Sequence, residues 1–87
     1  MQIETKSSFI KDLKEIPKET RLKVAEVIND LEQAKSLASL ACIKKLKGHH
    51  NFYRIRIGNY RLGFALEGET VILVRFLPRK DIYRFFP

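Results

Sequence analysis

The stretch YRIRIGNYRLGFAL, residues 53–66, decides the fold of this 87-residue chain. Apolar and polar side chains alternate on both sides of the central Gly58-Asn59 pair, and this two-residue period is typical of half-buried β-strands. A glycine followed by an asparagine between two such runs is a signal for a tight turn. The stretch therefore predicts a β-hairpin with one apolar face and one basic face.

The residues that follow the hairpin predict a third strand. A second turn at residues 67–69 leads into residues 70–77, the most continuously apolar run of the chain, which Pro78 ends. Because a strand that is buried on both faces is apolar throughout, this run is expected at the centre of the sheet.

The residues before the hairpin have a helical period instead. After a short strand in residues 1–5, Ser7 or Ser8 is a suitable N-cap for a helix that ends near Pro17. Pro17 suits the first turn of a second helix. The apolar stripe of that helix consists of Val24, Val27, Ile28, Leu31 and Ala34. Almost no linker separates the two helices, which predicts an antiparallel helical hairpin.

The connection from the second helix to the hairpin is left open by its sequence. Residues 36–43 are apolar without a clear period, so they either extend the helix or form an ordered connection. The element order is β-α-α-β-β-β, which predicts an α+β fold with the helical hairpin packed on one face of a mainly antiparallel sheet. Residues 1–87 are expected to form a single domain, because two separate cores would each be too small to be stable.

Composition excludes several classes of protein. No apolar run approaches the roughly 18 residues that span a bilayer, and the first residues have no pattern of a secretory signal. These features predict a cytoplasmic protein without a membrane partner. Cys42, the single cysteine, has apolar neighbours and is interpreted as a small buried hydrophobic residue.

The net charge of +7 is confined to the second half of the chain. Residues 1–43 contain seven basic and seven acidic side chains, whereas residues 44–87 contain ten basic and three acidic ones. A localised positive field of this kind favours a polyanion such as nucleic acid, or an acidic protein partner.

Strand alternation gathers part of this charge on one face of the sheet. Arg54 and Arg56 share a face of the first hairpin strand, and Arg61 lies on the corresponding face of the second. The same groove is expected to contain two small residues and two further arginines, Gly63, Ala65, Arg75 and Arg79. The small residues leave a floor that a ligand can approach, and the arginines close its ends. The groove is either a phosphate-binding site, for which the planar guanidinium is well suited, or a solvated face that keeps the protein soluble.

These residues, together with their flanking segments, resemble a known family. Residues 45–48 (KLKG), 53–62 (YRIRIGNYRL) and 79–83 (RKDIY) are similar to the RelE/ParE superfamily of toxins from bacterial and archaeal toxin–antitoxin systems. Residues 9–17 resemble the opening helix of that family, so the resemblance covers nearly the whole chain. The family fold that it implies agrees with the element order read from the periodicity.

Resemblance to the RelE branch implies an endoribonuclease that cleaves mRNA in the ribosomal A site and is neutralised by a cognate antitoxin. In that branch the 2′-hydroxyl of the RNA attacks the adjacent phosphate and leaves a 2′,3′-cyclic phosphate, which implies neither a metal ion nor a small-molecule cofactor. The positions that match the family's catalytic residues are Arg54, Arg56, Arg61, Arg79 and Tyr83. The other basic residues expected to contact mRNA or 16S ribosomal RNA are Lys44, Lys45, Lys47, Arg75, Lys80 and Arg84.

The resemblance leaves the general base open. Arg61 and Arg79 are suited to clamping the phosphate, and Tyr83 to stacking on a base or orienting the nucleophile. The family often has lysine where this chain has Arg54 and Arg56, and lysine can lose its proton, whereas arginine, with a pKa above about 12, cannot. The two arginines therefore suit transition-state stabilisation, and the base is Tyr83, a group of the ribosomal RNA, or absent.

Three other features are interpreted as structural. His49 and His50 lie in an expected loop, and adjacent side chains on an extended segment point in opposite directions, which argues against an acid–base pair. They also lack the ligand spacing of a zinc site. Tyr53 and Tyr60 are expected to face the core, and residues 85–87 are interpreted as packing against the domain.

Two other functions fit the same sequence. One is a ParE-type toxin that binds DNA gyrase and needs no phosphate-cleaving groups. The other is a non-catalytic module whose basic face binds an acidic partner, an interpretation favoured by the missing lysine. The set of four arginines at the matched positions favours the ribonuclease.

Overall fold

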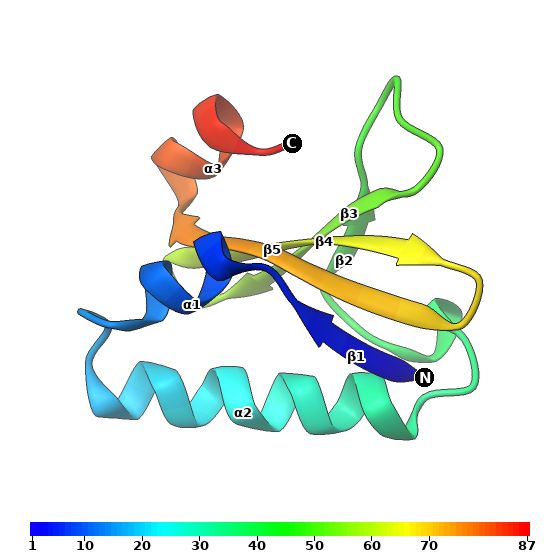
Figure 1. Cartoon of the computed structure of the whole chain (residues 1–87), viewed down its shortest axis with the longest axis horizontal. Helices are drawn as coiled ribbons and strands as arrows, with labels where there is room; N and C mark the ends of the chain where they lie inside the picture. The colour runs from blue at the N-terminus through cyan, green and yellow to red at the C-terminus, as the bar shows by residue number, and fades with distance from the viewer.

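A five-stranded sheet forms the centre of the computed structural model, which describes residues 1–87 (Figure 1). The strands are β1 (Gln2–Thr5), β2 (Ile43–Lys45), β3 (Phe52–Ile57), β4 (Tyr60–Glu67) and β5 (Thr70–Pro78). Their order in the sheet is β1-β5-β4-β3-β2. Neighbouring strands are antiparallel except β1 and β5, which are parallel. The predicted hairpin corresponds to β3 and β4.

Helices lie on both faces of this sheet. They are α1 (Ser7–Leu13), α2 (Lys18–Gln33) and α3 (Arg79–Phe85), with a short 3-10 turn, η1 (Leu37–Ser39), after α2. In Figure 1, α2 runs below the sheet and α3 lies above it. The α+β class is therefore confirmed, and α3 is a helix that the periodicity did not indicate. None of these helices has the length and apolarity that crossing a bilayer requires.

The core lies between the sheet and the first two helices. Its buried members are Phe9, Val24, Leu31, Ile55, Ile57, Leu62, Phe64, Val71, Leu73 and Phe76. As predicted, Tyr53 and Tyr60 pack against this cluster: their rings stack on Phe64 and Phe76, with centroid separations of 5.5 and 5.0 Å. The apolar face of the hairpin is thus turned towards α2, which leaves its arginine face on the side of α3.

The sheet contains one strand more than the sequence indicated. Residues 36–43, whose conformation was open, form η1 and then lead into β2, a three-residue strand paired with β3. The central strand is β4, so the prediction that residues 70–77 occupy the centre is wrong. The physical reason is that β2 extends the sheet on the side of β3, whereas only β1 lies beyond β5.

The first helix is positioned by β5 and not by a serine cap. Neither predicted serine caps α1, whose N-cap residue is Lys6. Instead the Ser8 hydroxyl donates to the carbonyl oxygen of Val74 at 2.6 Å, and the Asp12 carboxylate accepts from the backbone N–H of Phe76 at 2.9 Å. Since β1 ends at Thr5, α1 satisfies backbone groups of β5 that would otherwise lie unpaired along its edge.

Candidate functional site

A pocket of about 570 Å³ opens between β2, β3, β4 and α3, on the arginine face of the sheet. Its lining residues are Cys42, Ile43, Lys44, Arg54, Arg56, Arg61, Arg79 and Tyr83. The fold therefore brings together in one pocket all five residues to which the sequence assigned a catalytic role, although they come from three separate elements.

The hairpin turn aligns the arginines of the pocket. Arg56 and Arg61 are direct partners across β3 and β4, on either side of the turn at Gly58, whose φ of 59° is easily adopted only by glycine. The backbone N–H of Arg79 donates to the carbonyl oxygen of Asn59 at 2.9 Å. This bond ties the first residue of α3 to the turn, so Arg79 and Arg61 lie at the same end of the pocket.

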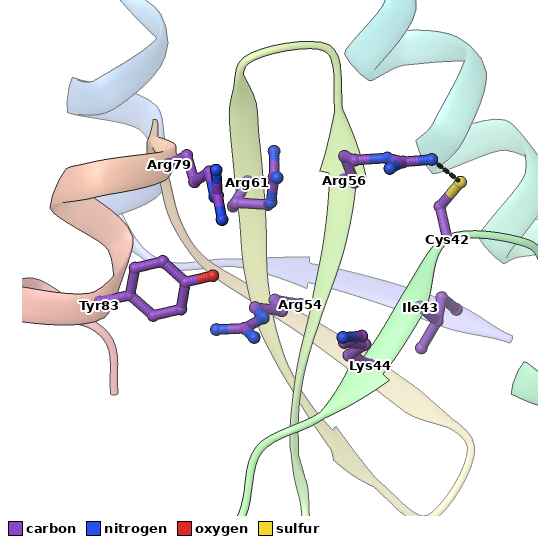
Figure 2. A pocket seen from close by; sticks show the side chains of 8 residues that line it. All are labelled: Cys42, Ile43, Lys44, Arg54, Arg56, Arg61, Arg79 and Tyr83. Carbon is purple, nitrogen blue, oxygen red and sulfur yellow. Dashed lines mark hydrogen bonds between the residues drawn. The ribbon is translucent and has the colours of Figure 1, made fainter.

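Two of the arginines are directed at the tyrosine. Figure 2 shows the side chains of Arg54 and Arg79 pointing towards the hydroxyl end of Tyr83, while the Arg61 guanidinium is turned towards the hairpin turn beside Arg79. The guanidinium of Arg54 lies over the Tyr83 ring, 4.5 Å from its centroid. Arg61 is oriented by bonds from Nη1 to the carbonyl oxygens of Gly58, at 3.1 Å, and Tyr60, at 2.9 Å.

Arg56 is directed to the opposite side of the pocket. Its Nη2 donates to Sγ of Cys42 at 3.7 Å, and Figure 2 shows its side chain turned away from Tyr83. The backbone N–H of Arg56 also donates to the carbonyl oxygen of Cys42, at 3.1 Å. Arg56 thus lies on the side of β2, while Arg54 and Arg79 flank the phenol and Arg61 is held at the turn beside Arg79.

The electrostatics of the pocket favour an anion. None of its arginines has an acidic partner, because the only ion pair of the chain joins Arg75 to Asp12. The pKa of Tyr83 lies below its ordinary value, chiefly because the Arg79 side chain can donate to the phenolate oxygen and further because Arg54 and Arg61 are positively charged. The pocket therefore combines uncompensated cations with a phenol that ionises more easily than a free tyrosine.

The remaining basic residues differ in their relation to the pocket. Lys44 lines it, whereas Lys45, Lys47, Lys80 and Arg84 do not. Arg75 does not close the groove as expected, because Asp12 binds its Nε at 2.8 Å and its Nη2 at 3.1 Å. This pairing raises the pKa of Arg75 and holds its guanidinium against α1.

The expected small-residue floor is covered. Phe86 is 5% exposed and its ring lies on Gly63, while Ala65 is 6% exposed. The prediction of a floor open to ligand is therefore wrong, because the C-terminal residues fill the space that the small side chains leave. Packing is confirmed for Phe86, whereas Phe85 is half exposed.

The sequence did not indicate two of the residues that line the pocket, Cys42 and Ile43. Cys42 is exposed and not buried, since its φ of 64° puts it in the left-handed region just before β2 and its side chain turns towards Arg56. Ile43 follows it on the strand that the periodicity did not reveal. His49 and His50 lie outside the pocket, and the His49 ring packs edge-on against Phe52 at 5.4 Å.

Comparison with known proteins identifies the family of this chain. Residues 3–83 match the family described as the ParE toxin of the type II toxin-antitoxin system, parDE. Toxin RelE3 of Methanocaldococcus jannaschii is 44% identical over the full length of both chains. Putative toxin RelE1 of the same organism is 31% identical over 91% of this chain and 89% of that protein.

Solved structures share the fold. A chain of the RelB-RelE antitoxin-toxin complex from Methanococcus jannaschii is 43% identical with a TM-score of 0.82, over 97% of this chain and 99% of that one. A chain of the archaeal RelE-RelB complex from Pyrococcus horikoshii is 22% identical with a TM-score of 0.75, over 90% and 93% of the two chains. The chain therefore belongs to the RelE/ParE superfamily of type II toxin–antitoxin toxins and is of the RelE type.

Proposed function

We propose that the protein is a ribosome-dependent endoribonuclease that cleaves mRNA in the A site and so stops translation. The observation that carries this proposal is that three arginines without acidic partners, Arg54, Arg61 and Arg79, line one pocket with Tyr83 and lower the pKa of its hydroxyl. A surface that only attracts an acidic partner has no need of an ionisable hydroxyl at the focus of its cations. A transphosphorylation site needs both.

The proposed reaction uses the RNA's own nucleophile. The 2′-oxygen forms a bond to the adjacent phosphorus, the bond from phosphorus to the 5′-oxygen breaks, and the products are a 2′,3′-cyclic phosphate and a 5′-hydroxyl. The proton of the 2′-hydroxyl passes to the base, and the leaving 5′-oxygen takes up a proton from solvent. The step calls for no metal ion, because the nucleophile is activated by proton transfer and the negative charge that develops is stabilised by guanidinium groups.

The pocket suggests a role for each residue in this step. Arg61 and Arg79 hold the phosphate oxygens, since both lie at the end of the pocket where the Tyr83 hydroxyl points. Arg54 stabilises the transition state and keeps the tyrosine ring in place through their contact at 4.5 Å. Tyr83, with its lowered pKa, is the group of this chain best suited to accept the 2′-hydroxyl proton. Arg56, on the side of β2, is suited to contact the neighbouring RNA backbone.

Several features support the ribosome as the place of action. The basic residues outside the pocket, Lys45, Lys47, Lys80 and Arg84, extend the positive surface beyond one phosphate, as contact with 16S ribosomal RNA requires. The relative with 44% identity over its full length is named a RelE toxin. A ribosomal target also means that the protein acts in the cytoplasm.

The proposed protein partner is a cognate antitoxin. The relative of known structure that is 43% identical was crystallised in a RelB-RelE antitoxin-toxin complex. By charge complementarity the antitoxin of this chain carries an acidic, amphipathic segment that covers the arginine pocket and excludes RNA.

Expression in a host cell followed by pulse labelling tests this function. Early loss of amino-acid incorporation is expected, with a primer-extension stop within ribosome-bound mRNA and a 2′,3′-cyclic phosphate at the new end. Replacing the ribose at the cleavage site with 2′-deoxyribose is expected to abolish cleavage. Early loss of thymidine incorporation while translation continues would instead identify a ParE-type gyrase inhibitor. This is the alternative function, because the matched family is described as a ParE toxin.

A further inference from the structure

The C-terminal helix rests on one transverse row of the sheet. Arg54 of β3, Gly63 of β4 and Arg75 of β5 are direct partners across three adjacent strands. The Tyr83 ring lies against the first of these residues and the Phe86 ring against the second. Tyr83 and Phe86 therefore contact the sheet at neighbouring residues of this row.

The Phe86 ring occupies the space that a side chain at position 63 would take. A Cβ added to Gly63 would lie 2.7 Å from Cγ and Cδ2 of Phe86 and 2.9 Å from Cδ1, well inside contact distance. These atoms form the base of the ring, so the ring cannot swing aside while the backbone stays. The Phe86 ring also packs in a T-shaped contact with Phe52, with centroids 5.6 Å apart.

Gly63 is needed for this space and not for its backbone conformation. Gly48, Gly58 and Gly68 all have positive φ, whereas Gly63 does not. An alanine at position 63 would therefore be compatible with the strand. It would disturb only the space over residue 63 that the Phe86 ring occupies, which we call the seat of Phe86.

Apart from this seat, α3 is held at its start by the bond from the Arg79 N–H to the Asn59 carbonyl oxygen and in its middle by one buried side chain. The helix has seven residues, of which only Ile82 is buried, and its exposed fraction is 1%. Tyr83 is 54% exposed, so its own packing does not fix it. Phe86 follows one turn later and its backbone N–H donates to the carbonyl oxygen of Ile82 at 3.0 Å, which links the seated ring to the helix that carries Tyr83.

We infer that Gly63 is a positioning residue for Tyr83: its missing side chain forms the seat of Phe86, and the seated ring holds α3 so that Tyr83 lies over Arg54. The inference rests on the proposed function for the part that Tyr83 plays in cleavage. The Gly63→Ala substitution lifts the ring by about 1 Å to reach normal contact distance, and Tyr83 moves with it. A displacement of this size in a reacting group lowers the rate by up to about 100-fold.

Two measurements on the full-length protein test the seat. One is single-turnover cleavage of ribosome-bound mRNA, and the other is the ionisation of Tyr83, followed by the ring carbon signals of ¹³C-tyrosine in NMR spectra. In Gly63→Ala we expect a 10- to 100-fold lower rate and a pKa of Tyr83 that returns towards its ordinary value, because the phenol leaves Arg79 and Arg54. Tyr53 and Tyr60, which pack at the core, are internal controls whose signals stay unchanged.

The Phe86→Ala variant gives the matched comparison. Without the ring, Tyr83 also leaves its position, so the rate and the pKa change as in Gly63→Ala. Adding Gly63→Ala to Phe86→Ala is then expected to have no further effect, because the three atoms nearest to the added Cβ all belong to the Phe86 ring. Independent, multiplying losses in the double variant, or an unchanged Tyr83 titration in both single variants, would overturn the inference.

The two measurements also separate the seat from the proposed function. If the wild-type protein does not cleave ribosome-bound mRNA, the proposed function fails, while the Tyr83 titration of the variants still decides whether Gly63 positions α3. If cleavage occurs and the titration does not change, the function stands and the seat is refuted.

Discussion

Arg54 and Arg75 lie two strands apart in the same row of the sheet, with Gly63 between them, yet their surroundings differ completely. Arg75 has its guanidinium in a two-point contact with Asp12, and the two side chains are only 26% and 11% exposed. Arg54 has no acidic partner and lies over Tyr83 in the pocket. The comparison teaches that one acidic residue separates a structural arginine from arginines available to a ligand.

The largest expected effect concerns the unpaired arginines. Arg61→Ala and Arg79→Ala are expected to lower the cleavage rate by about 10² to 10³-fold, because each removes a cation from the developing negative charge. The thermal melt of Arg79→Ala is expected to stay close to that of wild type, since exposed substitutions change stability by under about 0.5 kcal/mol. Arg61 is half-buried and donates two hydrogen bonds, so Arg61→Ala is expected to lose about 1 kcal/mol and to remain folded. Primer extension on ribosome-bound mRNA measures the rate.

Lys23→Ala is the control for these two variants. Lys23 is an exposed basic residue of α2, which lies on the other side of the sheet from α3, so cleavage should remain near the wild-type rate. Folded Arg61→Ala and Arg79→Ala proteins that stay fully toxic would show that the unpaired arginines are not the phosphate clamp.

Tyr83→Phe tests the hydroxyl whose pKa those arginines lower. The substitution keeps the ring over Arg54 but removes the ionisable hydroxyl, so a loss of about 100-fold in rate is expected if the phenolate is the base. Because a base acts in its deprotonated form, the wild-type rate rises with pH, with a midpoint below the ordinary tyrosine pKa of about 10. Single-turnover rates between about pH 6.5 and 9 check this, and the same rise in Tyr83→Phe would assign the base elsewhere.

Asp12→Ala addresses the paired arginine. It removes two hydrogen bonds from Arg75 and one from the backbone N–H of Phe76, so the free energy of unfolding should fall by about 2 to 3 kcal/mol. Glu15→Ala, an exposed acidic residue just beyond α1, is the control, with an expected change below about 0.5 kcal/mol. Urea unfolding measures both, and equal stabilities for the two variants would mean that the Asp12 contacts contribute nothing.

The smallest expected effect is the dependence of antitoxin binding on salt. If acidic groups of the antitoxin cover the unpaired arginines, association slows several-fold as ionic strength rises, while apolar contacts keep the dissociation rate nearly constant. Stopped-flow association at low and high salt measures this. An on-rate that does not change with salt would place the antitoxin away from the arginine pocket.

Local pattern was sufficient for most of the site. The alternation in residues 53–66 places Arg54 and Arg61 on the face opposite the core, and the match to the RelE motif adds Arg79 and Tyr83. The same reasoning does not reveal β2, because three residues at the edge of a sheet are too few for a period. It also misplaces Cys42, whose left-handed backbone overrides the apolar character of its neighbours.

By itself, the sequence determined the order of β1, α1, α2, β3, β4 and β5, the apolar and basic faces of the hairpin and the confinement of the excess positive charge to residues 44–87. These properties depend on the two-residue and 3.6-residue periods, which neighbouring residues establish among themselves. Only the tertiary structure decided that Asp12 pairs with Arg75, 63 residues along the chain, and that Phe86 closes the floor at Gly63. Such contacts depend on which elements the packed core brings together, and no local period encodes them.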